Sequence, residues 1–121
     1  MVSTVMFSAV FSSVTSAGSV DGKGIYCPSL KKGYWFKDGK VTGYFIKGYN
    51  VTSFRDKARY TEKGATQIWW YINLDESYYL ERASLTLRQH NHAVGVPCQL
   101  VLSKQGITSR LQKIIEKAQK T

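Results

Sequence analysis

A chain of 121 residues is long enough for one hydrophobic core but too short for two, so we expect a single domain. Its 43% hydrophobic and 13% aromatic residues exclude wholesale disorder. Lysine and arginine outnumber the acidic residues by 17 to 8, which gives a formal net charge of +9. That charge favours an anionic partner such as nucleic acid, phospholipid headgroups or acidic polysaccharide; alternatively, it only keeps a basic domain in solution.

The segment before Asp21 carries no charged residue. It is apolar as far as Val14 and then small, so residues 1–17 fit a signal peptide, with the mature domain covering residues 18–121. The segment is too short and too rich in serine for a membrane span. We therefore expect a secreted or periplasmic protein whose mature chain does not insert stably into a membrane. The usual basic residues at the start of a signal are missing, and the alternative is an N-terminal strand of alternating Val and Ser.

Cys27 and Cys98 lie at opposite ends of the mature chain and do not have the spacing of a metal site. In an oxidising compartment they would pair, and closing a loop of about 70 residues stabilises by about 4 kcal/mol in the chain-entropy model. In a reducing compartment they would be two buried free thiols. The signal-like N-terminus favours the disulfide.

From Gly22 onward, short β-prone stretches alternate with turn residues. Asp38-Gly39 joins two of them, which predicts a hairpin with a two-residue type I′ turn. The chain is expected to bend away after Gly48 and to turn again at residues 62–64. Strands are expected within residues 22–27, 33–36, 40–46, 67–72 and 96–103, with a further hairpin across residues 77–90 that turns at 81–84.

The period of the apolar residues changes after Ser103, which can serve as a helix N-cap. The residues that then recur on one helical stripe are Ile107, Leu111, Ile114, Ile115 and Ala118. This pattern predicts an amphipathic helix over about residues 103–119. Its apolar stripe is expected to pack on the sheet and its basic face to be solvated.

These elements predict a mainly β fold of about seven antiparallel strands followed by one helix. A bridge between Cys27 and Cys98 requires their Cα atoms to lie within about 7 Å, so the first and last strands must meet. A meander whose end strands meet is a small closed or nearly closed barrel, which also removes exposed strand edges. The C-terminal helix is expected to pack on this barrel.

The aromatic hairpin at residues 33–49 indicates where a binding surface could lie. Alternation places Tyr34, Phe36, Val41, Gly43 and Phe45 on one face, which we assign to the core. The opposite face is mixed, and together with the strand near residue 70 it supplies the candidate binding residues Trp35, Lys37, Lys40, Tyr44, Trp69 and Tyr71. The alternative is that Trp35 and Tyr44 simply pack beneath the helix.

The sequence contains no motif for a catalytic nucleophile, paired catalytic carboxylates, a phosphate loop or a zinc site. We therefore expect a non-enzymatic protein without catalytic residues, metal ligands or cofactors. His90 and His92 could direct both rings to one side of a strand, as some metal sites require, but no carboxylate is near them in the sequence. We interpret the pair as part of a polar turn.

The motifs "DGKGIYC", "GYWFKDGKV", "IKGY", "YLERASLTL" and "CQLV", followed by a basic amphipathic helix, occur in this order across residues 21–118. In this the chain resembles small secreted, disulfide-bridged β-domain proteins of unknown function from environmental, especially marine, bacteria. The resemblance implies secretion and a disulfide but no activity. A weaker likeness, carried by "IYC" and "ARYTEKGATQIWW", is to periplasmic inhibitors of C-type lysozyme. Their Lys-Gly after the Trp is absent here, and basic lysozymes would repel a +9 chain.

Three functions therefore remain open. The first is a non-enzymatic binding module that holds a small ligand or a protein partner at the barrel mouth or on its face. The second is a polyanion or single-stranded nucleic-acid binder that uses aromatic rings among lysines. The third is a periplasmic inhibitor-type protein. We expect a monomer.

Overall fold

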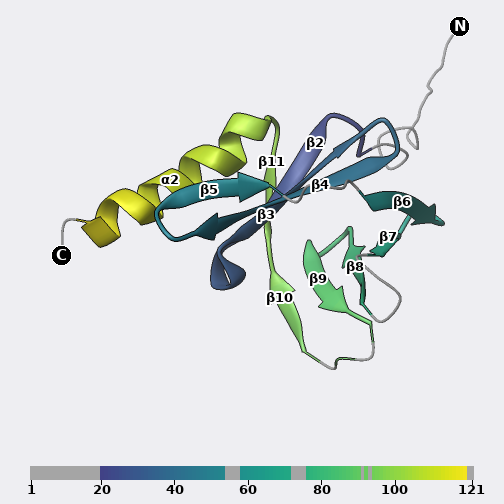
Figure 1. The fold of residues 1–121 in the computed structure, drawn as a ribbon. Helices are drawn as coiled ribbons and strands as arrows, with labels where there is room; N and C mark the ends of the chain where they lie inside the picture. The colour runs from purple at the N-terminus through teal and green to yellow at the C-terminus, as the bar shows by residue number, and fades with distance from the viewer. Residues whose placement is uncertain (1–19, 54–57, 72–75, 91, 93, 120–121) are drawn as a thin grey trace, which may run out of the picture.

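The structure is a computed structural model that describes residues 20–53, 58–71, 76–90, 92 and 94–119. The signal peptide expected at residues 1–17 lies outside the described residues. Within them, the chain forms the expected mainly β fold with one C-terminal helix, α2 (Lys104–Gln119) (Figure 1).

Ten antiparallel strands among the described residues form one continuous sheet. In chain order they are β2 (Lys23–Cys27), β3 (Lys32–Lys37), β4 (Lys40–Lys47), β5 (Asn50–Ser53), β6 (Ala58–Lys63), β7 (Gln67–Tyr71), β8 (Ser77–Glu81), β9 (Thr86–Gln89), β10 (Gly95–Pro97) and β11 (Gln99–Val101), and a 3₁₀ helix, η1 (Pro28–Leu30), follows β2. Neighbours run in the order β10-β9-β8-β7-β6-β4-β3-β2-β11, and β5 pairs with β4. The expected meander is confirmed.

Two local expectations are wrong. The strand count exceeds the expected seven by three. The last strand divides at Cys98, the chain after Gly48 folds back as β5 instead of bending away, and residues before the turn at Gly64 form the additional strand β6. The turn expected at residues 62–64 lies at residues 64–66, since Glu62 and Lys63 still pair in the ladder with β7. Gly64 adopts a φ of 62°, which glycine takes at little cost, so the turn begins there.

The β3–β4 hairpin has the expected register, with Lys37 opposite Lys40 and Tyr34 opposite Gly43. Asp38 and Gly39 both adopt positive φ angles, 53° and 76°, as a type I′ turn requires. The face assigned to the core is buried from Tyr34 to Gly43, and Phe45 at its far end is half-buried.

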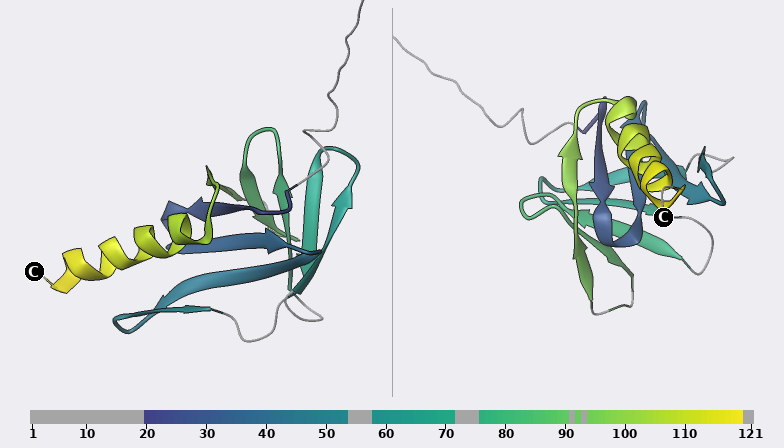
Figure 2. Two further views of the ribbon diagram at one scale, coloured as in Figure 1. Left: turned by 90° about the horizontal axis from the view of Figure 1, so that it is seen from above. Right: turned by 90° about the vertical axis from the view of Figure 1, so that its left-hand side faces the viewer.

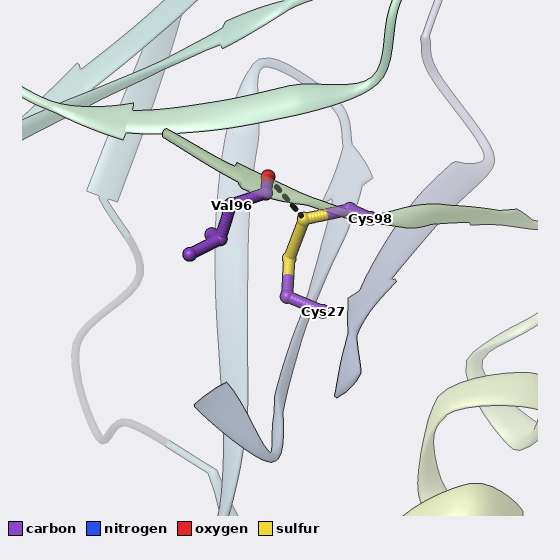
Figure 3. Close-up of a disulfide and its surroundings, with 3 residues drawn as sticks. All are labelled: Cys27, Val96 and Cys98. Carbon is purple, nitrogen blue, oxygen red and sulfur yellow. Dashed lines mark hydrogen bonds between the residues drawn. A yellow bond between two sulfur atoms is a disulfide. The ribbon is translucent and has the colours of Figure 1, made fainter. Parts of the chain in front are cut away.

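The barrel closes where β10 continues into β11 through Cys98. Before this residue the chain pairs with β9, and after it the chain pairs with β2, so one bent stretch joins the two ends of the sheet. Cys98 donates its backbone N–H to the Leu85 oxygen at 2.8 Å and forms the expected disulfide with Cys27, their Cα atoms 4.2 Å apart (Figure 3). The expected nearly closed barrel is confirmed.

Apolar side chains pack on both sides of the sheet. The barrel interior contains Ile25, Tyr34, Phe36, Val41, Ile68, Trp70, Leu80 and Leu87. Outside, α2 lies along the face formed by β2 to β5 and β11 (Figure 2) and buries Ile107 and Leu111 there. Ser103 caps the helix as expected, because its Oγ accepts the backbone N–H of Gly106 at 3.1 Å.

Candidate functional site: a pocket at one end of the barrel

The six candidate binding residues do not share one surface. Trp35 is 8% exposed and packs with Ile107 and Leu111 beneath α2, where half-buried Tyr44 joins the same cluster. Trp69 lies on β7 between Ile68 and Trp70, whose side chains are buried in the barrel, so its own ring lies on the outer face. The aromatic surface that would combine Trp35 with Trp69 is therefore not formed.

Lys37 and Lys40 flank the β3–β4 turn and are exposed. The Lys37 ammonium lies 3.4 Å from an Asp21 carboxylate oxygen. The two lysines are thus grouped as expected, but at a hairpin end separate from the other candidates.

Trp69 belongs to a row of side chains on the outer face of β6, β7 and β8. The Lys63 ammonium lies 4.2 Å from the centre of its ring, and Tyr79 stacks on it with the ring centres 4.4 Å apart. Its indole N–H donates to the Gln67 side chain at 2.9 Å. Because Lys63 and Tyr79 already contact the ring, stacking of a base on Trp69 would require this row to open. Tyr71, 59% exposed, lies on the same strand.

A pocket of about 370 Å³ opens at the end of the barrel where β2 leads into η1. We call it the barrel-end pocket. Its apolar lining comes from Leu30, Leu87, Val94 and Val96, and its polar lining from Lys32, Tyr34, Tyr78, Gln89 and His92. Apolar walls with a few convergent polar groups are typical of small-molecule sites.

Strand alternation explains the polar groups of this pocket. Lys32 lies two residues before Tyr34, and Gln89 two residues after Leu87, so both continue a core-facing row beyond the apolar core. Polar residues at core-facing positions indicate that the core ends there in an opening. This signal is present in the sequence, but strand alternation alone assigns Tyr34 to the core and nothing in the sequence distinguishes Tyr78.

The two tyrosines are held in their neutral forms. Burial, and to a lesser extent the nearby Tyr78 and Glu76, raises the pKa of Tyr34 well above its usual value. Burial first, and then Glu76, also raises the pKa of Tyr78, whose hydroxyl donates to Glu76 at 3.4 Å. The centres of their rings lie 6.4 Å apart. Because both are neutral phenols, their hydroxyl groups can donate or accept hydrogen bonds in the pocket.

Trp70 separates this pocket from the opposite end of the barrel. It is fully buried, and its ring lies 5.2 Å from that of Tyr34 and 5.5 Å from that of Phe36. Among the residues that the structure describes, none accepts a hydrogen bond from its indole N–H. Phe36 in turn borders a smaller, more apolar pocket of about 270 Å³ at the Lys23 end of β2. The larger pocket has more polar groups and is the better candidate for specific recognition.

The two histidines lie in different surroundings. The His90 ring is 5.6 Å from that of Trp69, whereas His92 lines the barrel-end pocket. In the part of the chain that the structure describes, no group of three or more His, Cys, Asp or Glu residues could hold a metal ion. No helix in that part is long and apolar enough to cross a membrane.

Comparisons with known proteins identify no relative: no family model, no curated protein and no solved structure matches the chain. Of the resemblance described above, the structure shows a small disulfide-bonded β domain. The bacterial origin and the family gain no support from these comparisons.

Proposed function

We propose that the chain is a secreted or periplasmic, non-enzymatic binding module that holds a small ligand in the barrel-end pocket. The observation that carries this proposal is the pocket itself, about 370 Å³ with apolar walls and five polar side chains. The disulfide supports a location outside the cytoplasm, because such bonds persist in oxidising compartments.

The lining favours a compact ligand with an apolar body and at least one polar group. The apolar part would contact Leu30, Leu87 and Val96, while the Tyr78 hydroxyl and Gln89 would orient the polar part. The disulfide holds the site in shape, since Cys27 immediately precedes η1 and Cys98 follows β10, and both elements supply lining residues. A preformed site loses little entropy when it binds.

The test is native mass spectrometry of the purified protein, followed by isothermal titration of compounds. Val94→Trp should fill the pocket and weaken binding at least tenfold, because it displaces several buried methylenes of the ligand. Leu102→Trp is the matched control. Val94 and Leu102 are similarly exposed, at 78% and 70%, but Leu102 directly follows β11 and does not line the barrel-end pocket. Tyr78→Phe should cost about two- to tenfold.

Equal binding by wild type and Val94→Trp, with both melting normally, would place the ligand elsewhere. Failure of every compound at millimolar concentration would count against a small-ligand module altogether.

A polyanion or single-stranded nucleic acid is the second candidate ligand. Most of the described cations lie on α2 or on the strands that pack against it. Among the described residues of 20–53 and 99–119, the cations are Lys23, Lys31, Lys32, Lys37, Lys40, Lys47, Lys104, Arg110, Lys113 and Lys117, against the acids Asp21, Asp38 and Glu116. Over residues 58–97 the structure describes four cations and three acids. Two of these acids, Glu62 and Glu81, form ion pairs with Arg82 and Arg88. Nucleic-acid affinity that vanishes by roughly 0.2 M salt would indicate simple charge attraction.

An inhibitor-type role is the third candidate. A specific protein captured from periplasmic extract by wild type, and by Val94→Trp equally, would favour it over a small ligand.

A further inference from the structure

A second depression lies beside the C-terminal half of α2 and adjoins the barrel-end pocket, with which it shares the lining residues Leu30 and Lys32. We call it the helix-side groove; its volume is about 410 Å³. It is lined by Ile114, Ile115 and Ala118 of α2, by Phe45 and Ile46 of β4, by Gly48 and Tyr49 of the turn after β4, and by Leu30, Lys31 and Lys32. Its surface is therefore built mostly from apolar side chains.

The groove exists because α2 covers the sheet incompletely at this end. Ile107, Leu111 and Ile115 are fully buried on the sheet, whereas Ile114 is half-buried and Ala118 is exposed. Leu30 and Tyr49 remain 39% and 64% exposed. A contiguous apolar depression that a fold leaves open is unfavourable in water and indicates a contact surface.

The charged residues that line the groove, Lys31 and Lys32, are both basic. Lys47 and Lys117 are the chain neighbours of the lining residues Gly48 and Ala118, and Glu116 is the chain neighbour of the lining residue Ile115. The acid of α2, Glu116, lines a different depression, on the side of the helix that faces Val51. Lys117 in the last turn also offsets the negative end of the helix dipole, which would otherwise disfavour an anion there.

We propose that the helix-side groove binds a single-chain anionic amphiphile, of the chemistry of a fatty-acid anion. The acyl chain would lie on Ile46, Ile114 and Ala118, and the carboxylate would lie beside Lys31 and Lys32. An apolar surface alone would bind many apolar ligands without selectivity, but the lysines that line this groove favour a ligand with an anionic headgroup. A hollow between a helix and a strand suits one inserted chain better than the flat surface of a bilayer.

The proposal is tested with dodecanoate below its micellar concentration, by isothermal titration of the full disulfide-bonded protein. Dodecyltrimethylammonium has the same chain with the opposite charge, and butyrate has the same headgroup without the chain. We expect one dodecanoate per protein and much weaker binding of both controls. Phosphatidylglycerol vesicles provide the arm that reports a membrane surface.

Three variants locate the site. Ala118→Trp, at an exposed helix position, should fill the groove and lower dodecanoate affinity at least tenfold, because displacing even two methylenes removes that much binding. Lys31→Gln should weaken it by up to about fivefold, as expected for one exposed charge contact. Lys40→Gln removes the same charge at the β3–β4 turn, at the opposite end of β4, and should bind like wild type.

Lys31 and Ala118 do not line the barrel-end pocket, so the two sites can fail independently. The proposal is overturned if dodecyltrimethylammonium binds as well as dodecanoate, or if a folded Ala118→Trp binds dodecanoate unchanged. Binding to the vesicles without binding of monomeric dodecanoate overturns it in favour of a membrane surface. Loss of dodecanoate binding in Val94→Trp but not in Ala118→Trp would transfer the ligand to the barrel-end pocket.

Discussion

Asp21 ties the start of β2 to the turn of the following hairpin. One carboxylate oxygen accepts the backbone N–H of Asp38 at 2.6 Å, and the other lies 3.4 Å from the Lys37 ammonium. Asp38 lies in the turn with a positive φ, beyond the last pair of the β3–β4 ladder. The Asp38 hydrogen bond first, and then Lys37, lowers the pKa of Asp21 below its ordinary value of 3.8.

We predict that Asp21→Asn destabilises the protein at pH 7 and that the difference disappears in acid. A carboxyl whose folded pKa is depressed stabilises the fold above its unfolded pKa of about 4, and this stabilisation is lost as the pH falls through the folded pKa. Urea unfolding of both proteins at pH 7, 4 and 2 measures it. A difference that is undiminished at pH 2 would show that the charge of Asp21 is not responsible.

Two glycines allow α2 to approach the sheet closely. A Cβ on Gly24 would lie 2.6 Å from the Tyr34 backbone oxygen and 2.8 Å from the Trp35 ring, and a Cβ on Gly33 would collide with Ile107. Gly24 on β2 is paired with Trp35 on β3, and Gly33 on β3 is paired with Tyr26 on β2. Ile107 therefore packs against the sheet at two glycine positions, beside Tyr26 and Trp35, which sets the position of the helix.

We predict that Gly33→Ala costs about 1–3 kcal/mol of unfolding free energy, because the added methyl overpacks the helix contact. Ile107→Ala alone should cost about 2–5 kcal/mol through the cavity it leaves. The double variant should lose less unfolding free energy than the sum of the two single losses, because Ile107→Ala removes the atoms that the new methyl meets. Additive costs in urea unfolding would mean that the helix contact is not what Gly33 protects.

Closure of the barrel depends on one residue and its bond. The chain pairs with β9 before Cys98 and with β2 after it. The disulfide from Cys98 to Cys27 joins residues 71 positions apart in the sequence. The stretches on either side of it, β10 and β11, are only three residues long. Few ladder hydrogen bonds therefore hold the two ends of the sheet together, and the disulfide supplements them.

We predict that replacing both cysteines by serine lowers the free energy of unfolding by about 4 kcal/mol, the chain-entropy value for a loop of this length. Hydrogen exchange should show protection lost first in β10 and β11, before β7 and β8. Reduced wild type is the control, because it lacks the bond but keeps the sequence. Exchange that rises uniformly over all strands would mean that the bond stabilises the whole fold and not the closure.

Much of the fold and part of the site could be predicted from local sequence. The register of the Lys37–Lys40 hairpin follows from the Asp38-Gly39 turn, and the helix follows from a stripe of period 3.6. The exposure of the candidate binding residues could not be predicted in this way, because one face of a hairpin can be covered by an element that is distant in the sequence. Trp35 is such a case, buried by Ile107 from a helix more than 70 positions later in the chain.

The sequence by itself determined the mainly β meander, the disulfide pairing once an oxidising compartment is assumed, and the faces of the central hairpin. Each depends on residue period and turn chemistry within a few residues. Only the tertiary structure decided that α2 covers Trp35 while Trp69 lies on a separate part of the outer surface, and that Tyr34 and Tyr78 border an open pocket. The physical reason is that openings depend on where the core runs out and where α2 stops covering the sheet, which is set by packing between elements distant in sequence.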